Sequence, residues 1–114
     1  MTTPTNYTTE EKIQIANTIL QQLGGRKFKA MTGAKEMYAT DAGLRINKIP
    51  KNASKANKCE ITLTVNDTYH VVFWHVGMKK GLEPFCNTVA EYNDVYEDML
   101  QDIWTAVTGQ YTKF

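Results

Sequence analysis

The chain contains little cysteine: Cys59 and Cys86 are the two among its 114 residues. Their spacing resembles neither a disulfide framework nor a metal knuckle, so we interpret them as reduced thiols of a cytosolic protein. No apolar stretch reaches the roughly 18 residues that a membrane-spanning helix needs. The first residues lack the basic start and apolar run of a secretory signal. We therefore give no weight to the glycosylation triplets at Asn6, Asn52 and Asn66.

Side-chain sets typical of catalysis are also lacking. The sequence shows no Ser/His/Asp or Cys/His arrangement and no metal-ligand spacing. His70 and His75 are five residues apart on one expected strand, so they should point to opposite faces and share neither metal nor substrate. The segment MTGAK, residues 31–35, lacks the length and second glycine of a phosphate-binding loop. We predict a protein that is not an enzyme and uses no cofactor.

The totals are those of a globular protein. Hydrophobic residues make up 42% and charged residues 22% of the chain, far from the composition of disordered proteins. A chain of this length can bury enough surface to fold alone. We predict a single domain over residues 1–114.

Charge is divided unevenly along the chain, although the net charge is only +1. Residues 26–80 contain eleven Lys or Arg and four acids, whereas residues 81–114 contain one Lys and six acids. Such asymmetry suggests a charged partner.

Two helices are indicated at the ends of the chain. Thr8 and Glu11 match a capping box, and Gly24-Gly25 provides a stop, which predicts a helix between them. Thr88, Glu91 and Gly109 give the same signals for a second helix up to residue 108, with a continuous apolar face. Its other face is acidic, which is either a solvated surface or a negative surface for a basic partner. The acids proposed for partner binding are Asp94, Glu97, Asp98 and Asp102.

The middle of the chain has β patterns. Residues 35–47 read as two short strands around Asp41-Ala42-Gly43, and residues 58–76 as two longer strands that turn at Asn66-Asp67. RKFKAM, residues 26–31, is a further candidate strand. The order predicts a two-layer α+β fold with an N-terminal helix, an antiparallel meander of four to five strands and a C-terminal amphipathic helix.

The turn of the long hairpin determines which side chains a binding face would show. A two-residue turn at Asn66-Asp67 would pair Leu63 with His70 and place Tyr69 and Phe73 on a face with Lys58, Glu60 and Thr62. Aromatic and basic sheet faces bind single-stranded nucleic acids by stacking. A three-residue loop would instead bury Tyr69 and Phe73, and a third arrangement places one helix over each face.

The segment KIPKNASKANK, residues 48–58, contains four lysines and no acid. Pro50 should end the preceding strand, and Asn52 could cap a short helix that gathers the ammonium groups on one side. The segment is either a solvated loop or an anion site. The residues proposed for ligand binding are Lys48, Lys51, Lys55, Lys58, Tyr69 and Phe73.

Four segments, in order along the chain, resemble a widespread family of small phage-encoded proteins. They are TILQQLGGRKFKAMTGAK (18–35), GLRINKIPKNASKAN (43–57), CEITLTVNDTYHVVF (59–73) and YEDMLQDIWTAVTGQYT (96–112). The resemblance covers most of the chain and implies a phage or prophage origin and action in the cytoplasm of a bacterial host. It transfers no catalytic or binding residue.

Three functions remain open at this level. The first is a non-catalytic phage accessory protein that binds nucleic acid or a phosphate-bearing nucleotide through the basic loop and the sheet. The second is a counter-defence protein that inhibits a host immune component or sequesters its nucleotide signal. The third is an oligomeric structural protein, with Tyr111 and Phe114 as contacts.

Overall fold

The computed structural model describes residues 7–50, 52–80, 82–110 and 112. The predicted contacts at Tyr111 and Phe114, and the predicted ligand residue Lys51, lie outside these residues. The elements in chain order are α1 (Thr9–Leu23), α2 (Arg26–Thr32), β1 (Lys35–Ala39), β2 (Gly43–Lys48), β3 (Lys58–Leu63), β4 (Tyr69–Lys79), β5 (Glu83–Val95), the 3-10 helix η1 (Glu97–Met99) and α3 (Leu100–Thr108).

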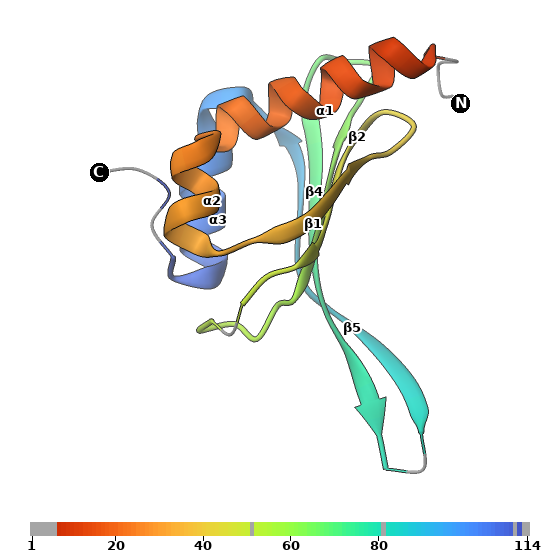
Figure 1. The fold of residues 1–114 in the computed structure, drawn as a ribbon, viewed down its shortest axis with the longest axis vertical. Coiled ribbons are helices and arrows are strands. Elements are labelled where there is room, and N and C mark those ends of the chain that lie inside the picture. Colours follow the sequence, from red (N-terminus) through yellow and green to blue (C-terminus); the bar gives the residue numbers. More distant parts are fainter. Residues whose placement is uncertain (1–6, 51, 81, 111, 113–114) are drawn as a thin grey trace.

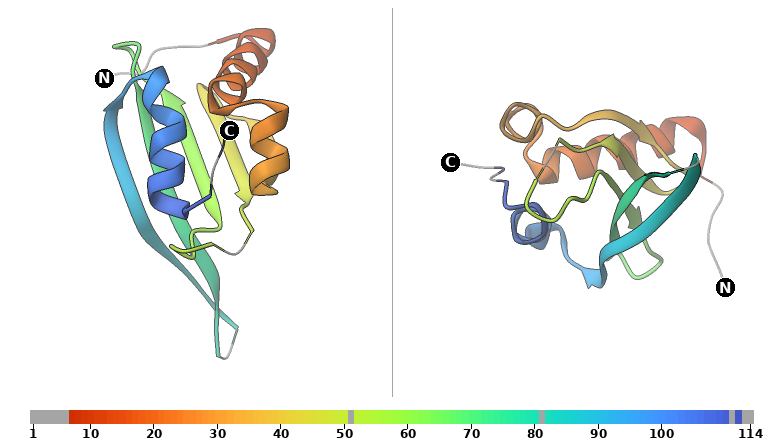
Figure 2. Two further views of the ribbon diagram at one scale, coloured as in Figure 1. Left: turned by 90° about the vertical axis from the view of Figure 1, so that its left-hand side faces the viewer. Right: turned by 90° about the horizontal axis from the view of Figure 1, so that it is seen from below.

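The strands form one antiparallel sheet in the order β1-β2-β3-β4-β5, so each strand pairs with the next along the chain. The α-helices lie together on one face of this sheet, with α1 packed on β1 and β2 and α3 beside it (Figures 1 and 2). This arrangement confirms the predicted α+β fold of N-terminal helix, β-meander and C-terminal helix.

The ends of α1 follow the sequence signals. The Thr8 hydroxyl accepts a hydrogen bond from the Glu11 amide at 3.1 Å, and the Glu11 carboxylate accepts one from the Thr8 amide at 2.8 Å. Gly24 has φ +126°, which a residue with a Cβ rarely adopts, and it ends the helix. Ala16, Ile19 and Leu23 are buried, so the predicted apolar stripe faces the core.

Residues 26–31, a candidate strand, belong instead to helix α2. The helix buries Phe28 and Thr32, four residues apart, and the Thr32 hydroxyl donates to the Phe28 carbonyl at 2.7 Å. Gly33, with φ +71°, ends it. Phe28 packs edge-on against Trp104 with ring centroids 4.8 Å apart, so tertiary packing stabilises a helix too short to persist alone.

The predicted C-terminal helix is wrong over its first half, because residues 88–95 belong to strand β5. Two register shifts against β4 insert extra residues into β5, and Asp94 has φ +54°. The residues of β5 that pack against the core are Val89, Ala90, Tyr92 and Val95, and the three-residue step between the last two imitates a helical period. The helix proper is α3, and Gly109 ends it with φ +77°, as predicted.

The turn between β3 and β4 contains three residues, which is the alternative that the sequence left open beside a two-residue turn. Leu63 pairs with Tyr69, not His70, and the Thr64 amide donates to the Thr68 carbonyl across the loop. Asp67 adopts φ +61° in this loop. Because a shift of one residue turns every side chain of β4 to the other face, Tyr69 and Phe73 point into the core.

Strands β4 and β5 extend beyond the rest of the sheet as a two-stranded ribbon. The pairing of β3 with β4 begins at Lys58 and Trp74, whereas β4 and β5 stay paired as far as Lys79 and Glu83. The ribbon projects from the body in Figure 1. At its base, the Asn57 side chain accepts from the Val76 amide at 2.9 Å and donates to the Val76 carbonyl at 2.8 Å.

Candidate functional site

The face of the sheet opposite the helices carries no helix of the described chain (Figures 1 and 2). We call this surface the open face. Strand alternation places on it the side chains that lie between the buried ones. They are Tyr38, Arg45, Asn47, Lys58, Glu60, Thr62, His70, Val72, Trp74 and Glu91.

Arg45, on β2, contacts three neighbours on the open face. Its Nη1 lies 3.1 Å from the Glu60 carboxylate, and its Nε donates to the Asn47 side-chain oxygen at 3.0 Å. Its guanidinium carbon lies 4.7 Å from the centroid of the Trp74 ring. Such a cation–π contact contributes about 0.5–1 kcal/mol at an exposed site. Arg45 and Trp74 therefore form a preorganised platform that combines a ring with a positive charge.

Lys58 and Tyr38 extend this platform. Lys58 pairs with Trp74 in the sheet, and its ammonium group donates to the Asn47 carbonyl at 3.0 Å, so its aliphatic stem lies along the open face. Tyr38 pairs with Arg45 on the other side and is 51% exposed. Aromatic residues thus lie on both sides of Arg45, with Tyr38 on the neighbouring strand β1 and Trp74 two strands away on β4.

The other end of the open face carries a His–Glu pair. His70 Nε2 lies 2.6 Å from the Glu91 carboxylate, and the pair is an ion pair only when His70 is protonated. Val72, between Glu60 and Glu91 in the register, is 7% exposed beneath these longer side chains. The carboxylates of Glu60 and Glu91 therefore flank Val72 at this end of the open face.

The described lysines of the predicted basic loop, Lys48, Lys55 and Lys58, do not form a cluster. No helix forms at residues 52–57, in contrast to the expected helical turn. Asn52 instead organises a tight turn, in which its side chain accepts from Ser54 and donates to the carbonyls of Pro50 and Ala56. The sequence suggested that Asn52 caps a short helix, whereas its side chain here closes a loop.

The lysines of this loop have separate environments. Lys48 forms an exposed pair with Glu36 at 3.5 Å, Lys58 binds the Asn47 carbonyl, and Lys55 is exposed. The carbonyl oxygen of Lys55 lies 2.7 Å from His75 Nδ1, and this contact joins the loop to the ribbon. Lys58 is the lysine of the predicted set that the structure places on the open face.

The aromatic residues on this surface differ from the predicted ones. Phe73 and Tyr69 both belong to the hydrophobic core on the helix side of the sheet, so neither is on the open face. The residues that sequence reasoning missed are Tyr38, Arg45 and Trp74. The correct hairpin register would have identified Trp74, because it alternates with Phe73.

The predicted acidic residues do not share one helix. Asp94 is in β5, Glu97 and Asp98 are in η1, and Asp102 is in α3. Glu97 and Asp98, with Asp67, line a surface hollow of about 530 Å³ beside Tyr69. Burial raises the pKa of the Tyr69 phenol above its usual value, and nearby Glu97 adds to this effect. The neutral hydroxyl donates to the Gln22 side chain at 2.7 Å.

Metal and membrane signals are not found in the described part of the chain. These residues contain no group of three or more His, Cys, Asp or Glu side chains placed to hold a metal ion. None of the helices described above is long and apolar enough to cross a membrane. Comparison of the chain with protein-family models, curated proteins and solved structures finds no match.

Proposed function

We propose that this protein binds single-stranded nucleic acid on the open face and catalyses no reaction on it, as a small phage accessory protein. The observation that supports this proposal most is the Trp74 ring, which lies under Arg45 on a sheet face without a helix. Bases of an unpaired strand can stack on aromatic rings and on arginine guanidinium planes, whereas bases inside a duplex cannot reach them.

Charge on the open face favours binding that depends more on stacking than on phosphate contacts. Glu60 already neutralises part of the Arg45 charge, and Glu91 lies beside His70. Arg45 and Lys58 are the fixed cations of this face. We therefore expect about two phosphates to be neutralised, which for single strands gives a shallow salt dependence of about 1.4 log units per log unit of salt.

The test is fluorescence titration with oligothymidylate of about 10 nucleotides, a length typical of one single-strand site. Trp104 is 1% exposed, so quenching on binding reports on Trp74. Removing one stacking ring costs about 1–3 kcal/mol, so Trp74→Ala should weaken binding about 5- to 150-fold when measured by anisotropy of a labelled strand.

The matched control is Tyr96→Ala. Tyr96 is 60% exposed and lies outside the open face, so its loss should leave the affinity unchanged. A Trp74→Ala protein that folds and binds the strand as well as wild type would contradict the proposal. A mononucleotide added as competitor separates the two ligand classes, because it can occupy only one ring and should displace the strand weakly.

A further inference from the structure

The tip of the β4–β5 ribbon exposes apolar and basic side chains together. Met78 is 59% and Leu82 is 79% exposed, and Lys79 and Lys80 lie between them. In the described part of the chain, neither lysine has an ion-pair partner. Large exposed apolar side chains at the end of a projecting element are typical of a contact surface.

The ribbon is stiffened below its tip. The Phe85 ring covers Gly77 so closely that a Cβ at Gly77 would lie 2.9 Å from Phe85 Cζ. The same ring packs against His75 with centroids 5.4 Å apart. These contacts order the ribbon as far as Gly77 and Phe85, just below the tip, which lowers the entropy cost of docking.

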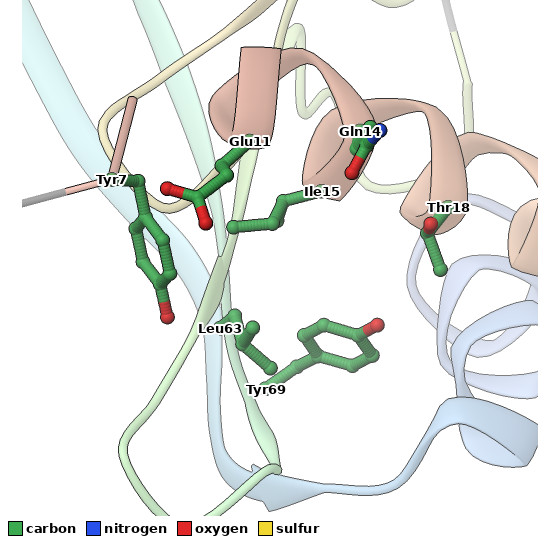
Figure 3. Close-up of a pocket in the computed structure, with 7 residues that line it drawn as sticks. All are labelled: Tyr7, Glu11, Gln14, Ile15, Thr18, Leu63 and Tyr69. Carbon is green, nitrogen blue, oxygen red and sulfur yellow. The ribbon is translucent and has the colours of Figure 1, made fainter. Parts of the chain in front are cut away.

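Two hollows at the other end of the molecule share the ring of Tyr69. The first, of about 370 Å³, lies between α1 and the start of β4, and Figure 3 shows Ile15, Leu63 and Tyr69 around it with Glu11 at its edge. The second is the acidic hollow of Asp67, Glu97 and Asp98. We call the pair the Tyr69 groove.

The Tyr69 groove has the opposite chemistry to the ribbon tip. Its apolar surface comes from Ile15, Leu63 and the tyrosine rings, and its charged groups are carboxylates. None of the described residues that line the groove is Lys or Arg. An apolar surface bordered by carboxylates matches an occupant that presents Met and Leu beside two lysines.

We infer that the ribbon tip of one molecule docks in the Tyr69 groove of a second copy of this chain. Figure 1 shows the tip at one end of the long axis, and α1 and the β3–β4 loop, which border the groove, at the other. This placement allows a head-to-tail contact, in which each added copy leaves one free tip and one free groove. Such a contact builds either an open chain or a closed ring.

The test uses two charge-reversed forms of the full-length chain. Lys79→Glu/Lys80→Glu reverses the tip, and Glu97→Lys/Asp98→Lys reverses the groove. In each variant the tip and the acidic hollow of the groove carry the same sign of charge, because Asp67 is the one carboxylate of that hollow left unchanged. Each should therefore lower the association constant at least about tenfold, measured by sedimentation velocity over a concentration series. Reductant is required because Cys86 is exposed and could otherwise link copies covalently.

An equimolar mixture of the two variants is the decisive sample. The acidic tip of one variant faces the basic groove of the other, and the remaining tip and groove keep their wild-type charges. The mixture should therefore recover association at the wild-type level. Arg26→Glu/Lys35→Glu, which reverses two exposed charges outside both surfaces, is the control and should associate normally.

Several results would overturn the inference. One is a wild-type protein that stays monomeric up to about 1 mM, the concentration range of a weak contact. Another is unchanged association in either charge-reversed variant. A third is an equimolar mixture that remains dissociated. A groove that captures a host protein while the wild type stays monomeric would show a different occupant. No nucleic acid is present in these samples, so failure here is separate from failure of the proposed strand binding.

Discussion

At the scale of single residues, the position of Arg45 depends on a negative charge that would repel a nucleic-acid strand. The Arg45 guanidinium forms an ion pair with Glu60 and a cation–π contact with the Trp74 ring. A glutamine at position 60 would still accept the hydrogen bond, so the orientation of Arg45 would be kept while the charge is removed.

Glu60→Gln should therefore strengthen strand binding. Removal of one repulsive charge, worth about 0.5–1 kcal/mol at a partly exposed site, corresponds to a two- to fivefold higher affinity. Glu10→Gln removes the same charge from the exposed side of α1 and should have no effect. Weaker binding by Glu60→Gln would mean that the carboxylate itself contacts the ligand. Both affinities are measured with the short oligothymidylate.

The two thiols should differ sharply in reactivity. Cys59 is fully buried, and burial raises the pKa of its thiol, with Glu60 adding to the shift and Arg45 opposing it. A raised pKa keeps the thiol protonated, and only the thiolate attacks disulfide reagents. A chromogenic disulfide should therefore titrate one thiol per chain, Cys86, in native buffer and two in denaturant. Rapid reaction of both thiols in native buffer would contradict the burial of Cys59.

At the scale of elements, most correct predictions rest on local signals, although the local pattern of Thr88 and Glu91 lies in strand β5 and begins no helix. The capping box of Thr8 and Glu11, the glycine stops and the turn at Asp41-Gly43 all act within a few residues, and each was predicted correctly. The exact length of the β3–β4 turn was not, because Asn66-Asp67 suits two-residue and three-residue loops alike.

The wrong predictions for β5 and for the open face have a common cause. A bulge changes the spacing of buried residues, so Tyr92 and Val95 imitate a helix although they lie in a strand. One residue of register decides whether Phe73 or Trp74 is on the open face. Burial against α3 and its Trp104 ring settles this choice, with Phe73 5.5 Å from that ring, and such long-range packing leaves no local signal.

The β3–β4 turn can be tested at Asp67. Its φ of +61° suits glycine and strains a β-branched side chain. Asp67→Val should lower the free energy of unfolding by about 1–2 kcal/mol, whereas Asp67→Gly should change it by less than about 0.5 kcal/mol. Urea unfolding monitored by circular dichroism measures both. Equal stability of the two variants would contradict a left-handed residue in this turn.

At the scale of the whole molecule, strand binding and self-association use different surfaces. The open face lies on the body of the sheet, whereas the ribbon tip and the Tyr69 groove are at the two ends of the long axis (Figure 1). A head-to-tail chain of molecules can therefore present one open face per copy. Linked binding sites on one strand raise the effective concentration of each next site.

The two proposals together predict cooperative binding to long strands. On oligothymidylate of about 60 nucleotides, which has room for several copies, the wild type should bind with a Hill coefficient greater than one. Lys79→Glu/Lys80→Glu should bind the short strand with wild-type affinity, because its open face is unchanged, but should bind the long strand without cooperativity. Trp74→Ala should show the reverse pattern, with weak binding to both strands and unchanged self-association. If the ribbon variant lost affinity for the short strand as well, its lysines would be nucleic-acid contacts and not contacts between copies.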